Sequence, residues 1–119
     1  MITLTLPWTT PPITSNARID RHTRARLTRE IRQTTQTLAK AEKLSPVASQ
    51  AVVTTTWYVP DNRIRDVGAP TPTTKAAIDG LVDAGILIAD DWRHIPEERY
   101  RIALDRTHPR IEITIEEAP

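Results

Sequence analysis

Three aspartates and one lysine occupy positions from which the sequence can assemble a hydrolytic site. Asp66 follows a run rich in β-branched residues, and Asp90 and Asp91 follow a helical stretch that contains Lys75. Mg²⁺ prefers a few carboxylate oxygens and keeps several waters, so two or three aspartates from separate segments are a sufficient site. A bound Mg²⁺ activates water and stabilises negative charge on phosphorus. A nearby lysine stabilises charge on the same phosphate.

The same residues also have ordinary structural interpretations. Aspartates are common in exposed loops, so Asp66 can pair with Arg65, and Asp90 and Asp91 can form a solvated turn. Lys75 can pair with a carboxylate four residues further along an exposed helix face, at position 79. For the aspartates, residue types alone favour these structural interpretations.

Charge is distributed unevenly along the chain. Residues 18–66 carry a net charge of +5 and residues 67–119 a net charge of −4, which gives +1 overall. Six arginines fall between positions 18 and 32, and Glu30 is the only acid between Arg21 and Arg32. Because the arginine fork suits phosphate oxygens, this segment predicts contact with a polyanion. The alternatives are an ordinary solvated helix face and an acidic protein partner.

The strands that position these residues follow from side-chain alternation and composition. Alternation predicts strands over 2–6, 99–104 and 110–115, and a run of Val, Thr, Trp and Tyr predicts one over 51–59. The short connection at 107–109 indicates that the last two strands form a closing hairpin with three isoleucines on one face.

Two helices are expected between the strands. The first runs from about residue 20 to 44, with a narrow apolar stripe. The second begins at Thr71, which can cap it, has Pro72 in its first turn, and ends at Gly85. The order β-α-β-α-β-β predicts an α+β fold with both helices on one side of the sheet. The apolar stripe of the first helix consists of Leu27, Ile31, Thr34, Leu38 and Ala41.

Composition excludes several classes of protein. With 39% hydrophobic and 26% charged residues, we expect one folded domain over residues 1–119. The absence of cysteine excludes disulfides and thiolate metal sites and favours a cytoplasmic protein. Three glycines match no glycine-rich phosphate loop. No apolar run approaches the roughly 20 residues that a membrane helix needs, so we expect no membrane contact.

Three segments, in this order, resemble the RusA family of Holliday junction resolvases. The first is residues 4–8 (LTLPW), followed by Pro12 and by Ser15 and Asn16, and the second is residues 60–66 (PDNRIRD). The third is residues 75–85 (KAAIDGLVDAG), followed by apolar residues and the aspartate pair. The third segment is the most specific, because it combines a lysine, a helical aspartate, an Ala-Gly stop and an aspartate pair at one spacing.

The resemblance implies a RusA-like fold and a Mg²⁺-dependent endonuclease, for which Mn²⁺ can substitute, often carried by phages and prophages. Such an enzyme cuts four-way DNA junctions symmetrically as a homodimer. The resemblance implies catalytic roles for Asp66, Lys75 and Asp90, and metal binding by Asp66, Asp90 and the adjacent Asp91. The residues expected at DNA are Asn16, Arg18, Arg21, Arg24, Arg63 and Arg65. One of the last two can instead pair with Asp61.

The chain departs from the family pattern directly after Asp66. The family reads Asp-x-Asp-Asn, whereas this chain reads Asp66-Val67-Gly68-Ala69, and residues 69–72 also alter the spacing before the lysine. Gly68 has no side chain with which to bind a metal. Three alternatives stay open: the remaining carboxylates suffice, another acid substitutes, or cleavage is lost and a junction-binding protein remains.

Overall fold

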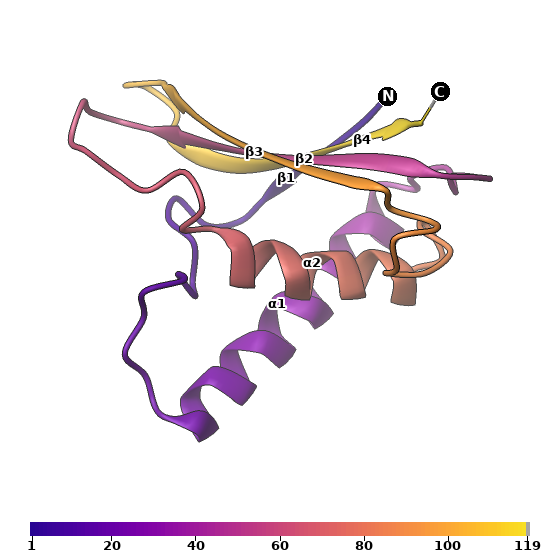
Figure 1. Cartoon of the computed structure of the whole chain (residues 1–119), viewed down its shortest axis with the longest axis horizontal. Coiled ribbons are helices and arrows are strands. Elements are labelled where there is room, and N and C mark those ends of the chain that lie inside the picture. The colour runs from indigo at the N-terminus through magenta and orange to yellow at the C-terminus, as the bar shows by residue number, and fades with distance from the viewer. Residues whose placement is uncertain (119) are drawn as a thin grey trace.

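The computed structural model describes residues 1–118 and has an α+β architecture (Figure 1). Both helices pack against one face of a four-stranded sheet, and no helix covers the other face. The predicted two-layer arrangement is confirmed. The elements in chain order are β1 (Ile2–Leu6), α1 (Arg21–Ala41), β2 (Ala51–Val59), α2 (Thr71–Asp83), β3 (Glu97–Leu104) and β4 (Arg110–Glu117).

The strand order is β1-β4-β2-β3. Strand β4 is antiparallel to both β1 and β2, whereas β3 is parallel to β2. The predicted hairpin of the last two strands is therefore wrong, because β2 lies between them. Strand β2 is buried along nearly its whole length, so it needs a partner at each edge. Residues 105–109 cross the end of β2. Nη1 of Arg110 donates to Oδ2 of Asp105 at 2.8 Å, and this ion pair stabilises the crossing.

The core lies between the sheet and the helices. Ile111, Ile113 and Ile115 are buried on one face of β4, as the alternation predicts, beside Leu4 from β1. They belong to the same buried cluster as Leu81 of α2. Burial of these aliphatic side chains drives the two layers together.

Helix α1 lies within the predicted range, and the carboxylate of Asp20 caps it by accepting a hydrogen bond from the backbone N–H of Thr23 at 2.7 Å. Its fully buried residues include Thr35 and Ala39, whereas the predicted Ala41 is exposed and Thr34 is only half-buried. That part of the stripe was wrong. Thr35 can be buried because its hydroxyl group donates to a backbone carbonyl one turn earlier, at 2.8 Å.

Helix α2 begins at Thr71 as predicted, but Pro70 is its N-cap and no side chain caps it. Gly85 follows the helix with a φ of 79°, which confirms the predicted stop. At Gly80 a Cβ atom would lie only 2.4 Å from the carbonyl oxygen of Arg32, so the glycine allows α1 and α2 to cross closely. Within residues 1–118, neither helix is long and apolar enough to cross a membrane.

Candidate nucleic-acid and metal site

Three contacts join the loop after β1 to the start of α2. The backbone N–H of Ile13 donates to the Thr73 hydroxyl at 3.1 Å, and this hydroxyl donates to the Ile13 carbonyl at 2.8 Å. The backbone N–H of Ser15 donates to the carbonyl oxygen of Ala69 at 3.1 Å. Two segments far apart in sequence, the opening loop and the β2–α2 loop, therefore lie side by side, and Asn16 directly follows their junction.

Lys75 and Asp90 form an ion pair. Lys75 lies in the first half of α2, and its Nζ binds Oδ2 of Asp90 in the loop that follows this helix. The Asp90 side chain is 15% exposed and that of Lys75 is 60% exposed. The structural alternative in which Lys75 pairs with Asp79 is wrong. Instead, the fold brings together two of the three residues that the family resemblance singles out as catalytic.

Asp66 lies on the exposed loop just before α2. Its Oδ1 accepts a hydrogen bond from the backbone N–H of Gly68 at 3.0 Å, which fixes the carboxylate in a tight local turn. A Cβ atom built on Gly68 would lie 3.6 Å and 3.9 Å from the two Asp66 carboxylate oxygens and 3.9 Å from the Thr71 hydroxyl oxygen. Position 68 therefore faces the Asp66 carboxylate, where a second acid would sit beside the first.

The donor set is chemically suited to Mg²⁺, because carboxylate oxygens are hard ligands and one or two of them suffice when waters complete the shell. Within residues 1–118, however, no three His, Cys, Asp or Glu side chains are grouped closely enough to hold a metal ion. The structure thus does not gather Asp66, Asp90 and Asp91 into a three-carboxylate site. Any metal site built from these residues would rest on fewer ligands.

The Asp91 carboxylate is directed at its own loop. Its Oδ1 accepts hydrogen bonds from the backbone N–H groups of Arg93 and His94, each at 3.0 Å, and lies 2.8 Å from Nδ1 of His94. The bond to the His94 side chain is the largest of the causes that lower the pKa of Asp91. This carboxylate therefore orders the turn after α2.

Glu98 is an acid near the site that the sequence reasoning missed. Its Oε1 accepts a hydrogen bond from the Tyr100 hydroxyl at 2.8 Å, and burial together with Glu98 raises the pKa of Tyr100 to about 12. Hydrogen bonding to Thr71 at the start of α2 acts in the opposite direction. The Thr71 hydroxyl itself donates to the Gly68 carbonyl at 2.7 Å, so Tyr100 lies next to the residue that closes the loop carrying Asp66. The sequence signal was an acid and an aromatic residue two apart on one strand, which share a face.

The two arginines before Asp66 have different surroundings. Arg65 is only 14% exposed; it pairs with Asp61 at 2.9 Å and lies over the ring of Trp57, 5.6 Å from its centroid. Its guanidinium also donates to two backbone carbonyls of the loop. Arg63 is 81% exposed and makes a longer contact with Asp61, at 3.4 Å. Both arginines contact Asp61. Because Arg65 is nearly buried it fastens the loop, whereas the exposed Arg63 remains accessible to a phosphate.

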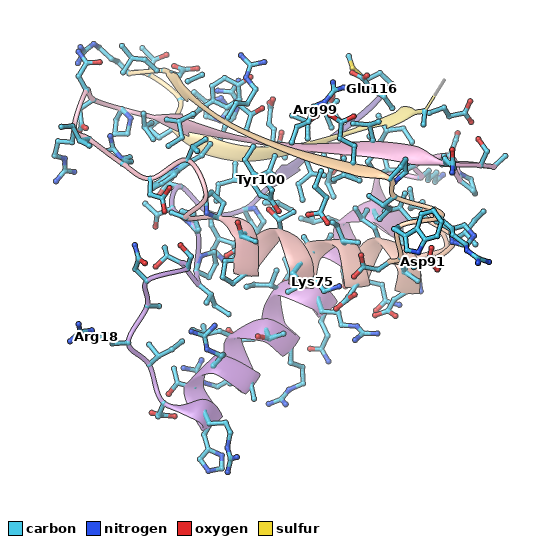
Figure 2. All side chains as sticks on the ribbon, viewed as in Figure 1. Arg18, Lys75, Asp91, Arg99, Tyr100 and Glu116 are labelled. Atoms are coloured by element: carbon cyan, nitrogen blue, oxygen red, sulfur yellow. The ribbon has the colours of Figure 1, made fainter. Side chains whose placement is uncertain are left out.

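The remaining residues expected at DNA lie along the segment that leads into α1. Asn16, Arg18 and Arg21 are exposed and Arg24 is half-buried. Figure 2 shows Arg18 pointing away from the body of the protein, on the extended segment before α1. Because Ser15 is tied to Ala69, this basic segment continues from the loop that carries Asp66. Not all arginines here are free for DNA, since Arg26 pairs with Glu30 and Arg32 with Asp83.

No protein-family model matches the sequence, and no curated protein matches it either.

Proposed function

We propose that the protein is a structure-selective endodeoxyribonuclease that hydrolyses phosphodiester bonds symmetrically in four-way DNA junctions, with Mg²⁺ as its cofactor. The observation that supports this proposal is the gathering of separated segments around α2. The Ser15–Ala69 contact ties the first segment that resembles the RusA family to the loop just after the second, and the Lys75–Asp90 contact lies within the third. Such a substrate places the protein in the cytoplasm of a bacterial or phage-infected cell.

Each residue has a role that fits its surroundings. Asp66 and Asp90 would hold Mg²⁺, and Asp91 orders the turn that follows Asp90. When bound, the ion supplies activation of water and stabilisation of charge on phosphorus. Lys75 positions the Asp90 carboxylate, and its side chain, which is 60% exposed, is accessible to the scissile phosphate. Glu98, which accepts a hydrogen bond from the Tyr100 hydroxyl on β3, is our candidate to substitute for the carboxylate missing at Gly68.

The DNA track in this proposal runs on both sides of Asp66. On one side is Arg63, and on the other are Asn16 and the arginines at 18, 21 and 24. Arginines that neutralise phosphates release counterions, so binding should weaken steeply as salt rises. A homodimer is proposed because a four-way junction presents two equivalent scissile phosphates that a two-fold protein would match.

A second candidate function is junction binding without cleavage. Two observations favour it: Gly68 supplies no carboxylate, and Asp90 is already compensated by Lys75. This protein would keep the arginine track and the fold, and would bind DNA regardless of the metal.

The deciding experiment is a cleavage assay on a labelled four-way junction with Mg²⁺ or Mn²⁺. The wild-type protein should give paired nicks at symmetric positions, and Asp90→Asn should slow cleavage by at least about a hundredfold. Binding of the same junction in EDTA should change by no more than about twofold in this variant. Asp79→Asn, the same change on α2, is the matched control and should cleave as the wild type does.

The two candidates give opposite results in this assay. If the wild-type protein binds the junction in a salt-dependent manner but produces no nicks at any metal concentration, the nuclease proposal is overturned and the binding protein stands. If Asp79→Asn slows cleavage as strongly as Asp90→Asn, the assignment of Asp90 fails.

A further inference from the structure

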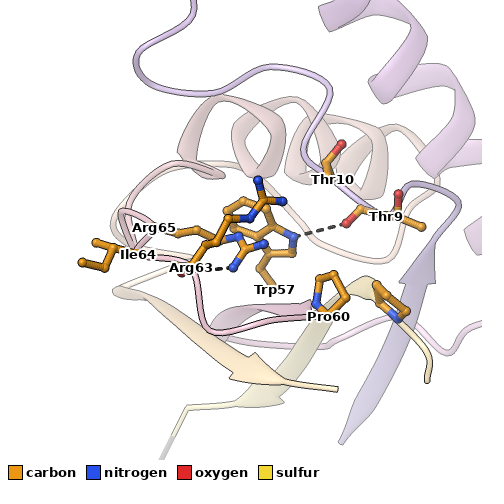
Figure 3. Close-up of a pocket in the computed structure, with 8 residues that line it drawn as sticks. Thr9, Thr10, Trp57, Pro60, Arg63, Ile64 and Arg65 are labelled. Atoms are coloured by element: carbon orange, nitrogen blue, oxygen red, sulfur yellow. Dashed lines mark hydrogen bonds between the residues drawn. The ribbon is translucent and has the colours of Figure 1, made fainter. Parts of the chain in front are cut away.

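A pocket of about 480 Å³ opens beside the loop that carries Asp66. It lies between the loop after β1, the end of β2 and the β2–α2 loop (Figure 3). Its apolar walls come from Trp57, Pro60 and Pro109. Its polar groups come from Thr9, Thr10, Arg63 and Arg65. Nothing proposed above for cleavage uses this pocket.

Ile64 lies at the edge of the pocket and is fully exposed, at 102% of the reference accessibility. It is flanked by Arg63 and Arg65 at the tip of the β2–α2 loop. A lone exposed aliphatic side chain needs no explanation by itself. Here, however, it stands between two arginines, directly beside a cavity with apolar walls.

The loop presents Ile64 from an ordered base. Arg65 binds the carboxylate and the backbone carbonyl of Asp61 and also the carbonyl of Arg63, so both neighbours of Ile64 are held. Below them, the indole N–H of Trp57 donates to the carbonyl of Thr9 at 3.2 Å (Figure 3). The pocket floor and the backbone that carries Ile64 are therefore each held by contacts within the protein.

The chemistry of this arrangement suits an unstacked nucleobase. A base is flat and largely apolar on its faces, and base-binding pockets combine apolar or aromatic walls with a few polar groups. The attached phosphate is negative, which matches Arg63 at the rim. DNA-bending proteins insert aliphatic side chains between base steps, and this partly unstacks the duplex. Ile64 has the exposure that such an insertion needs, and the exposed Arg63 beside it supplies a cation for the phosphate.

We propose that Ile64 inserts at the branch point of the junction and that the base it displaces enters the Trp57 pocket. By the Trp57 pocket we mean the cavity lined by Trp57, Pro60, Pro109, Thr10, Arg63 and Ile64. This inference rests on the proposed function for its DNA substrate but not for cleavage. It makes the pocket a site that selects the nucleotide at the branch point.

The test places 2-aminopurine at the branch point of a four-way junction and measures its fluorescence in EDTA, where no cleavage occurs. Binding of the wild-type protein should raise the fluorescence, because unstacking relieves quenching. Ile64→Ala should abolish the rise and weaken binding about tenfold, as expected when a buried aliphatic contact is lost. Thr10→Phe, which fills the pocket from its exposed side, should also abolish the rise while leaving Ile64 in place.

Ile88→Ala is the matched control, because Ile88 is an isoleucine that is 53% exposed outside the pocket. It should keep the fluorescence rise and bind within about twofold of the wild type. A rise that survives Ile64→Ala or Thr10→Phe overturns the inference, even if the junction is cleaved normally. A rise that both variants abolish supports it, even if the wild-type protein never cuts the junction.

Discussion

The ammonium group of Lys75 in α2 is paired with the carboxylate of Asp90 in the loop beyond that helix. The chain leaves the helix through the turn at Gly85 and returns far enough to bring the two charges together. The lysine side chain is 60% exposed, so solvent screens the pair at that end and its contribution to folding is modest, although Asp90 is only 15% exposed.

Lys75→Met should therefore affect cleavage far more than stability. We expect junction cleavage to fall by about a hundredfold or more, because a cation at the phosphate is lost. The free energy of unfolding should fall by about 1–2 kcal/mol, more than for a fully exposed pair, because Asp90 is only 15% exposed and loses its partner. Cleavage rates and denaturant unfolding measure the two effects. Lys40→Met, the same change on α1, should leave cleavage intact, and a stability loss large enough to explain the cleavage defect would contradict this prediction.

Gly68→Asp should build a second carboxylate beside Asp66. The nearest atom to the new Cβ would be an Asp66 carboxylate oxygen at 3.6 Å, which is ordinary contact, so the backbone accepts the change. In EDTA, repulsion between the two acids should lower the free energy of unfolding by about 1 kcal/mol. Mg²⁺ should reverse this loss, and cleavage should rise about tenfold or more.

Gly68→Asn is the control for that substitution, because it adds a side chain of the same shape without the charge. It should show neither the loss of stability in EDTA nor the gain with Mg²⁺. Thermal unfolding with and without Mg²⁺ distinguishes the two variants. Equal behaviour of the Asp and Asn variants would show that position 68 does not contribute to a metal site.

Tyr100 should make stability depend on pH in the alkaline range. Its pKa rises from 10.0 to about 12 in the folded protein, chiefly through burial and then through Glu98. Between these values the folded protein holds a proton that the unfolded chain has lost. The stabilising contribution is thus complete below about pH 10 and is lost as the pH rises toward about 12. Tyr100→Phe should flatten this part of the curve of unfolding free energy against pH.

Glu98→Gln separates the two causes of the Tyr100 shift. It removes the negative charge but leaves the burial, so the alkaline loss of stability should move only part of the way back toward pH 10. A spectrophotometric titration in a Tyr58→Phe background reports Tyr100 alone. An unchanged titration curve in Glu98→Gln would rule out this carboxylate as a cause.

Gly80→Ala should destabilise the crossing of the two helices. The added methyl group would meet the Arg32 carbonyl oxygen at 2.4 Å, and a backbone atom cannot rotate away. We expect a loss of about 1–3 kcal/mol in the free energy of unfolding. Asp79→Ala, at the preceding and less buried position, should change it by less than about 1 kcal/mol. Denaturant unfolding of both variants provides the comparison.

Local features of the fold were predictable from the sequence, and long-range pairings were not. The bounds of β1 and β2 match the prediction, because alternation and β-branched content are properties of short windows. The pairing of β3 with β2 was missed, since a five-residue connection after Leu104 resembles a hairpin loop when its distant neighbour is unknown.

The same distinction between local features and long-range contacts holds for the candidate site. Asp66, Lys75 and Asp90 were identified through a family resemblance, but the contact between the last two depends on how the loop after α2 returns. Arg65 was expected at phosphate, whereas the fold uses it to fasten its own loop over Trp57. The pattern within a segment identifies candidate residues for the site. Packing between segments then decides which of their charged groups are accessible to DNA and which are paired within the protein.

The position of strand β4 in the sheet determines when the sheet can form during synthesis of the chain. It is the last strand of the sheet in the chain, yet it lies between β1 and β2 and hydrogen-bonds to both. During synthesis, β1 has no partner in the sheet until residues 110–117 have left the ribosome. The sheet therefore closes only after translation of this last strand, and a nascent chain that stops short of it keeps the apolar face of β1 unprotected.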